Sequence, residues 1–258
     1  MLLKVEKIEG IIIGEQLYGE SSKILKIFTK KYGVISVISK GCRRPKSPLR
    51  MASSTLVYAN FDINYKENKI STLIGVDILD LFRNVVLDYS NLAKKTYVFV
   101  ILSLTIQVIN QKGITKGEIS SIYDICVNSI KKIDEGFDPL VIFNIVRLKL
   151  LEFLGVKPSL DCCSNCGGSN NIVTFSSSCY GFICSSCYNN EPLVSESSIK
   201  MLRMLYYVDI EKIKKLELIK EEKEEIDKFL NAYYEEHTGV YLNIKEKLKV
   251  ISKLGGVL

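Results

Sequence analysis

Two Cys-x-x-Cys pairs constrain this chain more than any other feature of its sequence. One pair is Cys163 and Cys166, the other is Cys184 and Cys187, and seventeen residues separate them. Each pair points two thiolates at one point in space, and four thiolates are what a tetrahedral zinc ion binds. The spacing is typical of a zinc site. Because four cysteines leave no open coordination position, we predict one structural Zn²⁺ in a small ribbon rather than a catalytic ion.

Other uses of the cysteines fit the sequence less well. A redox site needs only one Cys-x-x-Cys pair, and a disulfide framework needs an oxidising compartment. The chain has no apolar run before its first charges, so we expect no signal peptide. Cys162 and Cys179 leave the ligand set open, since either could replace a predicted ligand. We interpret Cys42 and Cys126 as lone thiols, with Cys126 in a helical core.

Residues 1–80 have the pattern of a small β-barrel domain. Turn signals separate five runs rich in β-branched or aromatic residues. The runs are Ile8–Ile13, Ile24–Phe28, Val34–Ile38, Leu56–Tyr65 and Ile70–Ile78. Five short strands in one segment favour a Greek-key barrel such as an OB-fold. An SH3-like barrel stays open as the alternative, because periodicity does not separate the two.

The positive charge of the chain is concentrated in this barrel segment. The net charge is +6, and no acidic residue occurs between Ser21 and Phe61. Gly41, Pro45 and Pro48 indicate that the densest basic part is a loop. A basic loop beside a barrel is suited to bind a nucleic-acid backbone, and the alternative is a solvated loop that keeps the protein soluble. The predicted contacts are Lys40, Arg43, Arg44, Lys46 and Arg50, with Lys23, Lys26, Lys30 and Lys31 as a second group.

Residues 81–258 have mostly helical periodicity, so the predicted fold is α+β with more than one domain. We predict one helical domain that the zinc ribbon interrupts at about residues 156–192. Pro139–Leu154 is apolar on nearly every face, which indicates a central buried helix. Tyr97–Ile109 is also apolar but too short to span a bilayer. We expect Phe229 and Leu230 to be buried in a helix that packs against the segment containing Leu151.

Catalytic signatures are absent from the sequence. It contains neither a Walker A motif nor a G-x-G-x-x-G motif. The single histidine, His237, follows two glutamates near the end of a helical segment, where we expect a surface residue or a favourable C-terminal charge. A four-cysteine site also disfavours a zinc hydrolase. We therefore predict that the chain is not an enzyme.

Two motifs occur in a fixed order along the chain. The first combines Tyr18-Gly19-Glu20 with Lys40-Gly41-x-Arg43-Arg44. The second combines Leu160-Asp161-x-Cys163-x-x-Cys166-Gly167 with Phe175-Ser176 and Cys184-x-x-Cys187. Together they resemble the RecO family of bacterial recombination mediators, and the resemblance covers essentially the whole chain. The chain departs from the family at Tyr180-Gly181, where a glycine pair is common, and in its extra cysteines Cys162 and Cys179.

The resemblance implies an N-terminal OB-fold, a helical domain and a zinc ribbon. It implies a cytoplasmic, nucleoid-associated protein that binds single- and double-stranded DNA, anneals complementary strands and has no membrane partner. It also implies that RecR and the C-terminal tail of single-strand-binding protein are partners, and that RecA is loaded at gaps as a result. Lys132, Lys200 and Arg203 are candidates for the tail site by their chemistry alone. The alternative is a zinc-ribbon adaptor of transcription or translation that binds mainly protein; the basic loop favours the DNA mediator.

Overall fold

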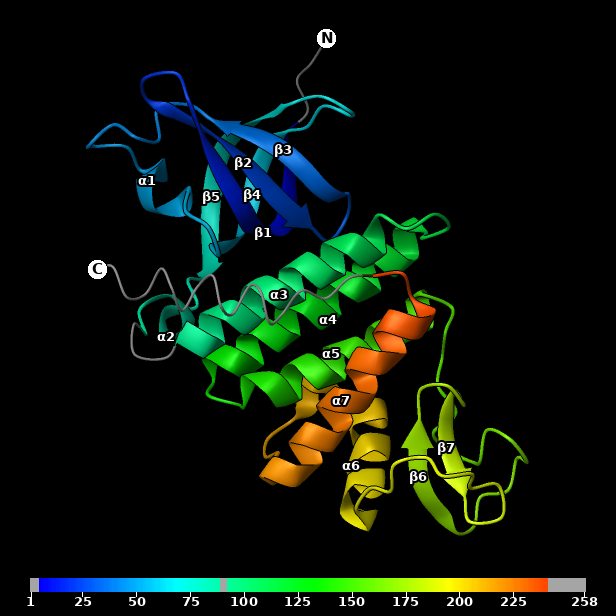
Figure 1. The fold of residues 1–258 in the computed structure, drawn as a ribbon. Coiled ribbons are helices and arrows are strands. Elements are labelled where there is room, and N and C mark those ends of the chain that lie inside the picture. The colour runs from blue at the N-terminus through cyan, green and yellow to red at the C-terminus, as the bar shows by residue number, and fades with distance from the viewer. Residues whose placement is uncertain (1–4, 89–91, 241–258) are drawn as a thin grey trace. The chain divides into compact units, whose positions relative to one another are not determined.

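The computed structural model describes residues 5–88 and 92–240, and it divides into two compact units (Figure 1). The first unit comprises Met1–Ser90 and Lys112–Val127, and the second comprises Asn91–Gln111 and Asn128–Leu258. The N-terminal part is rich in strands and the rest of the described chain is mainly helical, which confirms the predicted α+β class. The predicted domain boundary after residue 80 stays a prediction.

A five-stranded sheet closes on itself in the first unit. The strand order is β1-β2-β3-β5-β4, and β4 pairs with β1 to complete the barrel. Neighbouring strands are antiparallel except for β3 and β5, which pair in parallel through Val37 and Ile38. The strands are β1 (Val5–Tyr18), β2 (Ser22–Thr29), β3 (Gly33–Ser39), β4 (Tyr58–Asn64) and β5 (Ser71–Asp80). Each of the five predicted runs overlaps one of these strands.

Alternating apolar residues fill the barrel because successive side chains of a strand point to opposite faces. Ile12, Leu25 and Phe61 come from three different strands and are buried in one core. The pairing of β1 with β2 shifts register between Ile12 and Gly14, which places a bulge at Ile13. A bulge bends its strand, and from Glu15 onward every β1 residue is exposed.

The described helices begin where the barrel strands end, apart from the short α1 between β3 and β4. They are α1 (Leu49–Ala52), α2 (Arg83–Val86), α3 (Leu92–Ile109), α4 (Lys116–Asp134), α5 (Pro139–Phe153), α6 (Glu196–Tyr207), the 3-10 turn η1 (Ile210–Lys212) and α7 (Lys220–His237). Asp138 caps α5, since its carboxylate accepts hydrogen bonds from the backbone N–H groups of Leu140 and Val141 at 2.9 and 3.3 Å. Pro139 follows at the first helical position, where its missing N–H costs nothing.

Helix α5 is the centre of the second unit, as its all-round apolar sequence predicts. It packs against α3, α6 and α7. Leu151 of α5 is fully buried, and Phe229 and Leu230 of α7 are buried too. The predicted packing of the α7 segment against the Leu151 helix is therefore confirmed.

Helix α3 is strongly apolar. Within the described residues it is the one helix long and apolar enough to cross a membrane. Core helices of soluble proteins can have the same length and apolar composition. Helix α3 packs on α5, and its residues Val98, Ile101 and Leu104 are fully buried. The structure thus agrees with the prediction of a core helix, but the helix begins at Leu92 rather than Tyr97, so the expectation that it is too short to span a bilayer was wrong.

One cation lies in the middle of this helical core. Arg147 of α5 is fully buried and forms an ion pair with Asp227 of α7. Its guanidinium also donates a 2.6 Å hydrogen bond to the side-chain oxygen of Asn231 and lies 4.6 Å from the centre of the Phe143 ring. Burial lowers the pKa of Arg147, and the carboxylate of Asp227 opposes that shift. These contacts join α5 to α7.

A small two-stranded ribbon follows α5 and packs on the helices of the same unit. Its strands β6 (Ile172–Ser176) and β7 (Gly181–Cys184) are antiparallel. Phe175 of β6 meets Phe229 of α7 edge to face, with ring centres 5.0 Å apart. Arg203 of α6 donates a 2.8 Å hydrogen bond to the backbone carbonyl of Leu160, just before the first cysteine pair. The ribbon is therefore attached to α6 and α7 by aromatic packing and hydrogen bonds.

Candidate metal centre and nucleic-acid interface

The ribbon brings together the four cysteines that the sequence predicts as ligands. The sulfur atoms of Cys163, Cys166, Cys184 and Cys187 all lie within 4.8 Å of one another. The Cys166 and Cys184 sulfurs are 3.7 Å apart, far longer than the roughly 2.05 Å of a disulfide. Around a tetrahedral ion with metal–sulfur bonds of about 2.3 Å, neighbouring sulfurs are about 3.8 Å apart. The spacing of these thiols therefore fits a four-coordinate metal.

Backbone hydrogen bonds shape the two cysteine turns. The N–H of Gly167 donates to the carbonyl of Cys163 at 2.8 Å, and the N–H of Cys187 donates to the carbonyl of Cys184 at 3.1 Å. The strand ahead of the second pair needs a glycine, because a Cβ on Gly181 would lie 2.1 Å from the carbonyl oxygen of Ser159. This close approach lets the segment before the first pair run beside β7, where it forms a parallel bridge.

The pKa values of two thiols in the cluster shift in opposite directions. Burial alone would raise the pKa of the Cys163 thiol, but hydrogen bonds from the backbone N–H groups of Cys184, Cys166 and Asn165 lower that pKa to about 6. Hydrogen bonding with the thiols of Cys166 and Cys184 raises the pKa of Cys187 to about 12. Hydrogen bonds thus stabilise the thiolate of Cys163, and a bound cation would stabilise the thiolates of the other three cysteines.

The two extra cysteines lie outside this group. The Cys162 sulfur is 3.6 Å from the hydroxyl oxygen of Ser159, and the Cys179 sulfur is 3.8 Å from a carboxylate oxygen of Glu191. Both line a cavity of about 450 Å³ beside the ribbon. Within the described residues, the four paired cysteines are the one group close enough to share an ion. The structure therefore supports the predicted pairs over either substitute.

His237 is the last residue of α7, as one of the two sequence-based expectations has it, but its side chain is largely buried rather than on the surface. Its ring stacks on Tyr180 of the ribbon, with ring centres 4.2 Å apart, and one ring nitrogen lies 2.8 Å from the carbonyl oxygen of Ser177. Tyr233 contacts the same ring from α7. The histidine therefore helps to hold the ribbon against the helix. The sequence carried no signal for this contact, because nothing in it shows that the ribbon folds back on α7.

The basic segment of the first unit forms a closed loop. The hydroxyl groups of Ser39 and Ser53 are hydrogen bonded to each other at 2.8 Å at its buried base. Between them the chain makes successive turns, and Arg50 lies in the short helix α1 rather than in the loop proper. Cys42 within it is buried. The predicted loop over Lys40–Arg50 is observed as far as Pro48, and its last two residues belong to α1 instead.

A second set of hydrogen bonds ties this loop to the tip of the β1–β2 hairpin. The backbone N–H of Arg43 donates to the carbonyl of Ser21 at 2.9 Å, and its guanidinium donates to the carbonyl of Glu20 at 3.1 Å. The backbone N–H of Gly41 donates to the hydroxyl of Ser22 at 3.2 Å. The hairpin tip and the basic loop therefore form one structural element at one end of the barrel (Figure 1).

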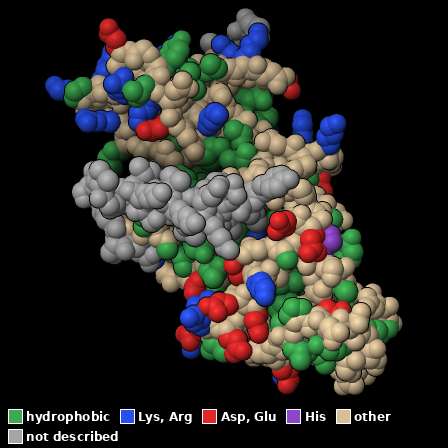
Figure 2. All heavy atoms as spheres, viewed as in Figure 1, with side chains coloured by type: hydrophobic (Ala, Val, Ile, Leu, Met, Phe, Trp, Pro, Cys, Tyr) green, Lys and Arg blue, Asp and Glu red, His purple; other side chains and the backbone are tan. Residues whose placement is uncertain are grey.

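The nine predicted DNA-contacting cations fall into two groups. Lys23 bonds Glu15 and the carbonyl of Ser53, and Arg43 bonds the hairpin carbonyls. Lys30 pairs with Asp124 and Lys31 with Glu6, both at 2.8 Å. The other five predicted residues have exposed side chains that form no ion pair or hydrogen bond with the described part of the chain. They are Lys26, Lys40, Arg44, Lys46 and Arg50. In Figure 2, Lys and Arg side chains gather at the end of the barrel where Figure 1 shows the basic loop.

The aromatic residues nearest to this loop in sequence point elsewhere. Tyr58 is buried, and its hydroxyl donates to Glu9 at 2.8 Å. Tyr32 stacks on Tyr65 with ring centres 4.1 Å apart, and its hydroxyl donates to Glu6 at 2.7 Å. Neither ring is available for a base, so the structure assigns both to packing of the barrel.

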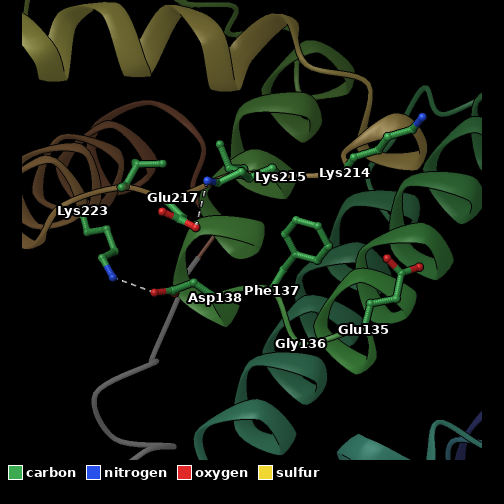
Figure 3. Close-up of a pocket in the computed structure, with 10 residues that line it drawn as sticks. Glu135, Gly136, Phe137, Asp138, Lys214, Lys215, Glu217 and Lys223 are labelled. Carbon is green, nitrogen blue, oxygen red and sulfur yellow. Dashed lines mark hydrogen bonds and ion pairs between the residues drawn. The ribbon is translucent and has the colours of Figure 1, made fainter.

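A separate pocket of about 380 Å³ opens in the helical unit between the α4–α5 turn and the segment before α7 (Figure 3). Its charged side chains balance, since three are acidic and three are basic. Lys223 pairs with Asp138 at 2.7 Å, and Lys215 lies 3.7 Å from Glu217. These pairs are drawn as dashed lines in Figure 3. Because the three acidic and three basic side chains sum to zero, the pocket has no net charge that would attract a charged ligand.

Comparisons with known proteins cover nearly the whole chain. The family described as Recombination protein O N terminal matches residues 2–82, and Recombination protein O C terminal matches residues 90–246. A protein named DNA repair protein RecO from Halalkalibacterium halodurans is 30% identical, over 96% of each chain. Proteins of the same name are 28% identical in Listeria monocytogenes serotype 4a, over 98% of each chain, and 29% identical in Bacillus subtilis, over 94% of this chain and 93% of that one.

Proposed function

Because this chain belongs to the RecO family, a family of DNA repair and recombination mediators that are not enzymes, we propose that it binds DNA and anneals complementary strands. The observation that supports this most is the basic loop. Three of its cations, Lys40, Arg44 and Lys46, and Arg50 in the adjoining helix α1, have exposed side chains that form no ion pair within the described residues. A loop whose cations are not neutralised by the protein is able to replace counterions on a phosphate backbone.

The strand order of the barrel supports an OB-fold rather than an SH3-like barrel. Five strands close in the order β1-β2-β3-β5-β4, and the OB-fold is a five-stranded Greek-key barrel. Proteins with this fold use a strand face and the loops at one end for oligonucleotides. The basic loop and the β1–β2 tip lie together at one end, which is where the proposed DNA path begins.

Annealing follows from electrostatics and needs no nucleotide hydrolysis. Two single strands repel each other through their phosphates, and bound cations reduce that repulsion. The hydrogen bonds at the loop base and at the hairpin hold the loop in one shape before DNA arrives. A preorganised surface avoids the entropic cost of ordering a loop during binding. We infer that single- and double-stranded DNA both bind, since phosphate contacts are shared by the two forms.

We infer that the metal of the cysteine cluster is zinc and that its role is structural. Four thiolates in tetrahedral spacing are the ligand set of structural zinc sites, and they exclude magnesium or calcium, which prefer oxygen ligands. The ion would be held by Cys163, Cys166, Cys184 and Cys187. It would fix the two turns of the ribbon, while Phe175, Tyr180 and Arg203 fix the ribbon to α6 and α7.

Protein partners are part of the same proposal. We infer that the protein acts with RecR and with the tail of single-strand-binding protein to promote RecA loading at gaps. The three cations suggested for the tail each have a partner within the chain. Lys132 pairs with Glu135 at 2.7 Å, Lys200 pairs with Glu196 at 2.5 Å, and Arg203 bonds the Leu160 carbonyl. An acidic tail would have to compete with those contacts, so they do not favour one of the three.

The test is a pair of matched double variants in a binding and annealing assay without ATP. Arg44→Ala with Lys46→Ala removes two unpaired cations, so the slope of log affinity against log salt on single strands flattens by about 1.4, or about 0.7 per phosphate contact. Annealing slows in parallel. Lys30→Ala with Lys31→Ala removes the same charge from ion-paired positions and changes the slope less. Equal slopes for wild type and the Arg44/Lys46 variant would move the DNA path away from this loop, and absence of binding by the wild type would contradict the proposed function.

A further inference from the structure

The tip of the β1–β2 hairpin exposes an aromatic side chain beside the basic loop. Tyr18 is 53% exposed and Leu17 is 65% exposed. Tyr18 pairs with Ser22 across the hairpin, so Gly19, Glu20 and Ser21 alone form the turn. Gly19 has a φ of +58° and open space around it, since a Cβ at that position would meet no atom within 4 Å. The turn is therefore uncrowded around Gly19, while its backbone carbonyl groups accept hydrogen bonds from Arg43 of the basic loop.

The bulge at Ile13 explains why these residues are exposed. Up to Ile12, β1 contributes apolar side chains to the barrel core. After the bulge the strand continues as a two-stranded ribbon with β2 that carries no core residue in its β1 half. The exposed side chains of Leu17 and Tyr18 add little to the stability of the fold, because neither belongs to the barrel core. An exposed tyrosine at a projecting tip is instead suited to contact a partner.

The neighbourhood of the tip decides the chemistry of that partner. Four hydrogen bonds join the tip to Gly41 and Arg43 of the basic loop. The hairpin has two acidic residues after the bulge: Glu15 pairs with Lys23 at 2.9 Å, and Glu20 lies in the turn, where the Arg43 guanidinium bonds its backbone carbonyl at 3.1 Å. A flat ring next to unpaired cations matches a nucleotide, whose base stacks while its phosphate binds the cations. An apolar protein surface would gain nothing from the cations.

We propose that Tyr18 stacks on an unpaired base of single-stranded DNA while the 40–50 loop binds the adjoining phosphates. This inference rests on the proposed DNA binding and adds to it a base contact, which phosphate contacts alone do not give. It makes the protein prefer single strands to duplex, because bases in a duplex are already stacked and paired.

The chain provides its own spectroscopic test because it contains no tryptophan. In a Tyr18→Trp variant, the emission of that single tryptophan is quenched when an unstructured thymidine oligonucleotide binds. Tyr207 is 55% exposed in the other unit, so Tyr207→Trp is a control of matched exposure whose emission stays unchanged. Quenching equal at both positions, or at neither while the oligonucleotide binds, would overturn the inference.

Affinity measurements separate this inference from the proposed function. Tyr18→Ala weakens binding of the thymidine oligonucleotide about 5- to 150-fold, the range for loss of one base stack. The salt slope stays that of the wild type, because tyrosine carries no charge, and duplex affinity changes little. Tyr18→Phe keeps the ring and retains wild-type affinity. Wild-type affinity in Tyr18→Ala would overturn the stacking contact while leaving phosphate binding intact, and no binding by the wild type would overturn both.

Discussion

The basic loop of the first unit and the cysteine ribbon of the second are both short irregular segments, but they are held in different ways. Hydrogen bonds within the chain close the loop at Ser39 and Ser53 and tie Arg43 to the β1–β2 hairpin. The ribbon has two strands of five and four residues, too few to build a core of their own. Its turns converge on four thiols instead.

This difference indicates how each segment responds to a substitution that removes one contact. The loop depends on several hydrogen bonds that each contribute about 1 kcal/mol, so the loss of one of them does not disorder it. If the ribbon binds the proposed metal, it depends on that one centre, and loss of any ligand would remove most of what orders its turns. The loop is thus held by many weak contacts within the chain, whereas the ribbon has its four thiols at a single point.

The largest expected effect is the removal of a metal ligand. Cys163→Ser abolishes metal binding, which is worth roughly 10–16 kcal/mol in small structural zinc sites, and it unfolds the ribbon while the barrel stays folded. Zinc content by elemental analysis and hydrogen exchange of the two units measure these outcomes. Cys179→Ser, which alters a thiol outside the cluster, is the matched control and keeps its zinc. Full zinc in Cys163→Ser would contradict the assigned ligand set.

A smaller effect is expected in the helices that carry the ribbon. Leu230 of α7 is fully buried, so Leu230→Ala lowers the free energy of unfolding by about 2–5 kcal/mol. Denaturant titration measures the loss. Lys228→Ala changes an exposed residue of the same helix and shifts stability by less than about 0.5 kcal/mol. Equal stability of the two variants would show that α7 is not part of the core.

The smallest effect is expected at the base of the basic loop. Ser53→Ala removes one of two buried hydroxyl groups that bond each other and leaves the Ser39 hydroxyl without that partner. The expected loss of unfolding free energy is about 1–3 kcal/mol, measured by the same titration. Replacing both serines by alanine costs less than the single change, since no buried hydroxyl is then left unpaired. A larger loss in the double variant would show that other contacts, rather than this hydrogen bond, close the loop.

Local patterns in the sequence determined much of this protein. The five apolar runs became the five barrel strands because alternation with period two is a property of each strand alone. The four paired cysteines converge because each Cys-x-x-Cys turn is a local structure. Helix α5 was recognisable because Asp138 and Pro139 begin it and its apolar residues continue around it. The loop character of residues 40–48 followed from Gly41 and its prolines.

Contacts between distant segments were decided only by the tertiary structure. The charge of Lys30 and Lys31 looked the same in sequence as that of Arg44, yet the fold pairs both lysines with carboxylates, and the Arg44 side chain forms no ion pair with the described residues. Arg147 and His237 gave no sign that one lies in the helical core and the other against the ribbon. Tyr18 became a neighbour of the basic loop only when the hairpin folded beside it. Whether a polar or aromatic side chain is free depends on what the fold places next to it, and a linear pattern does not contain that information.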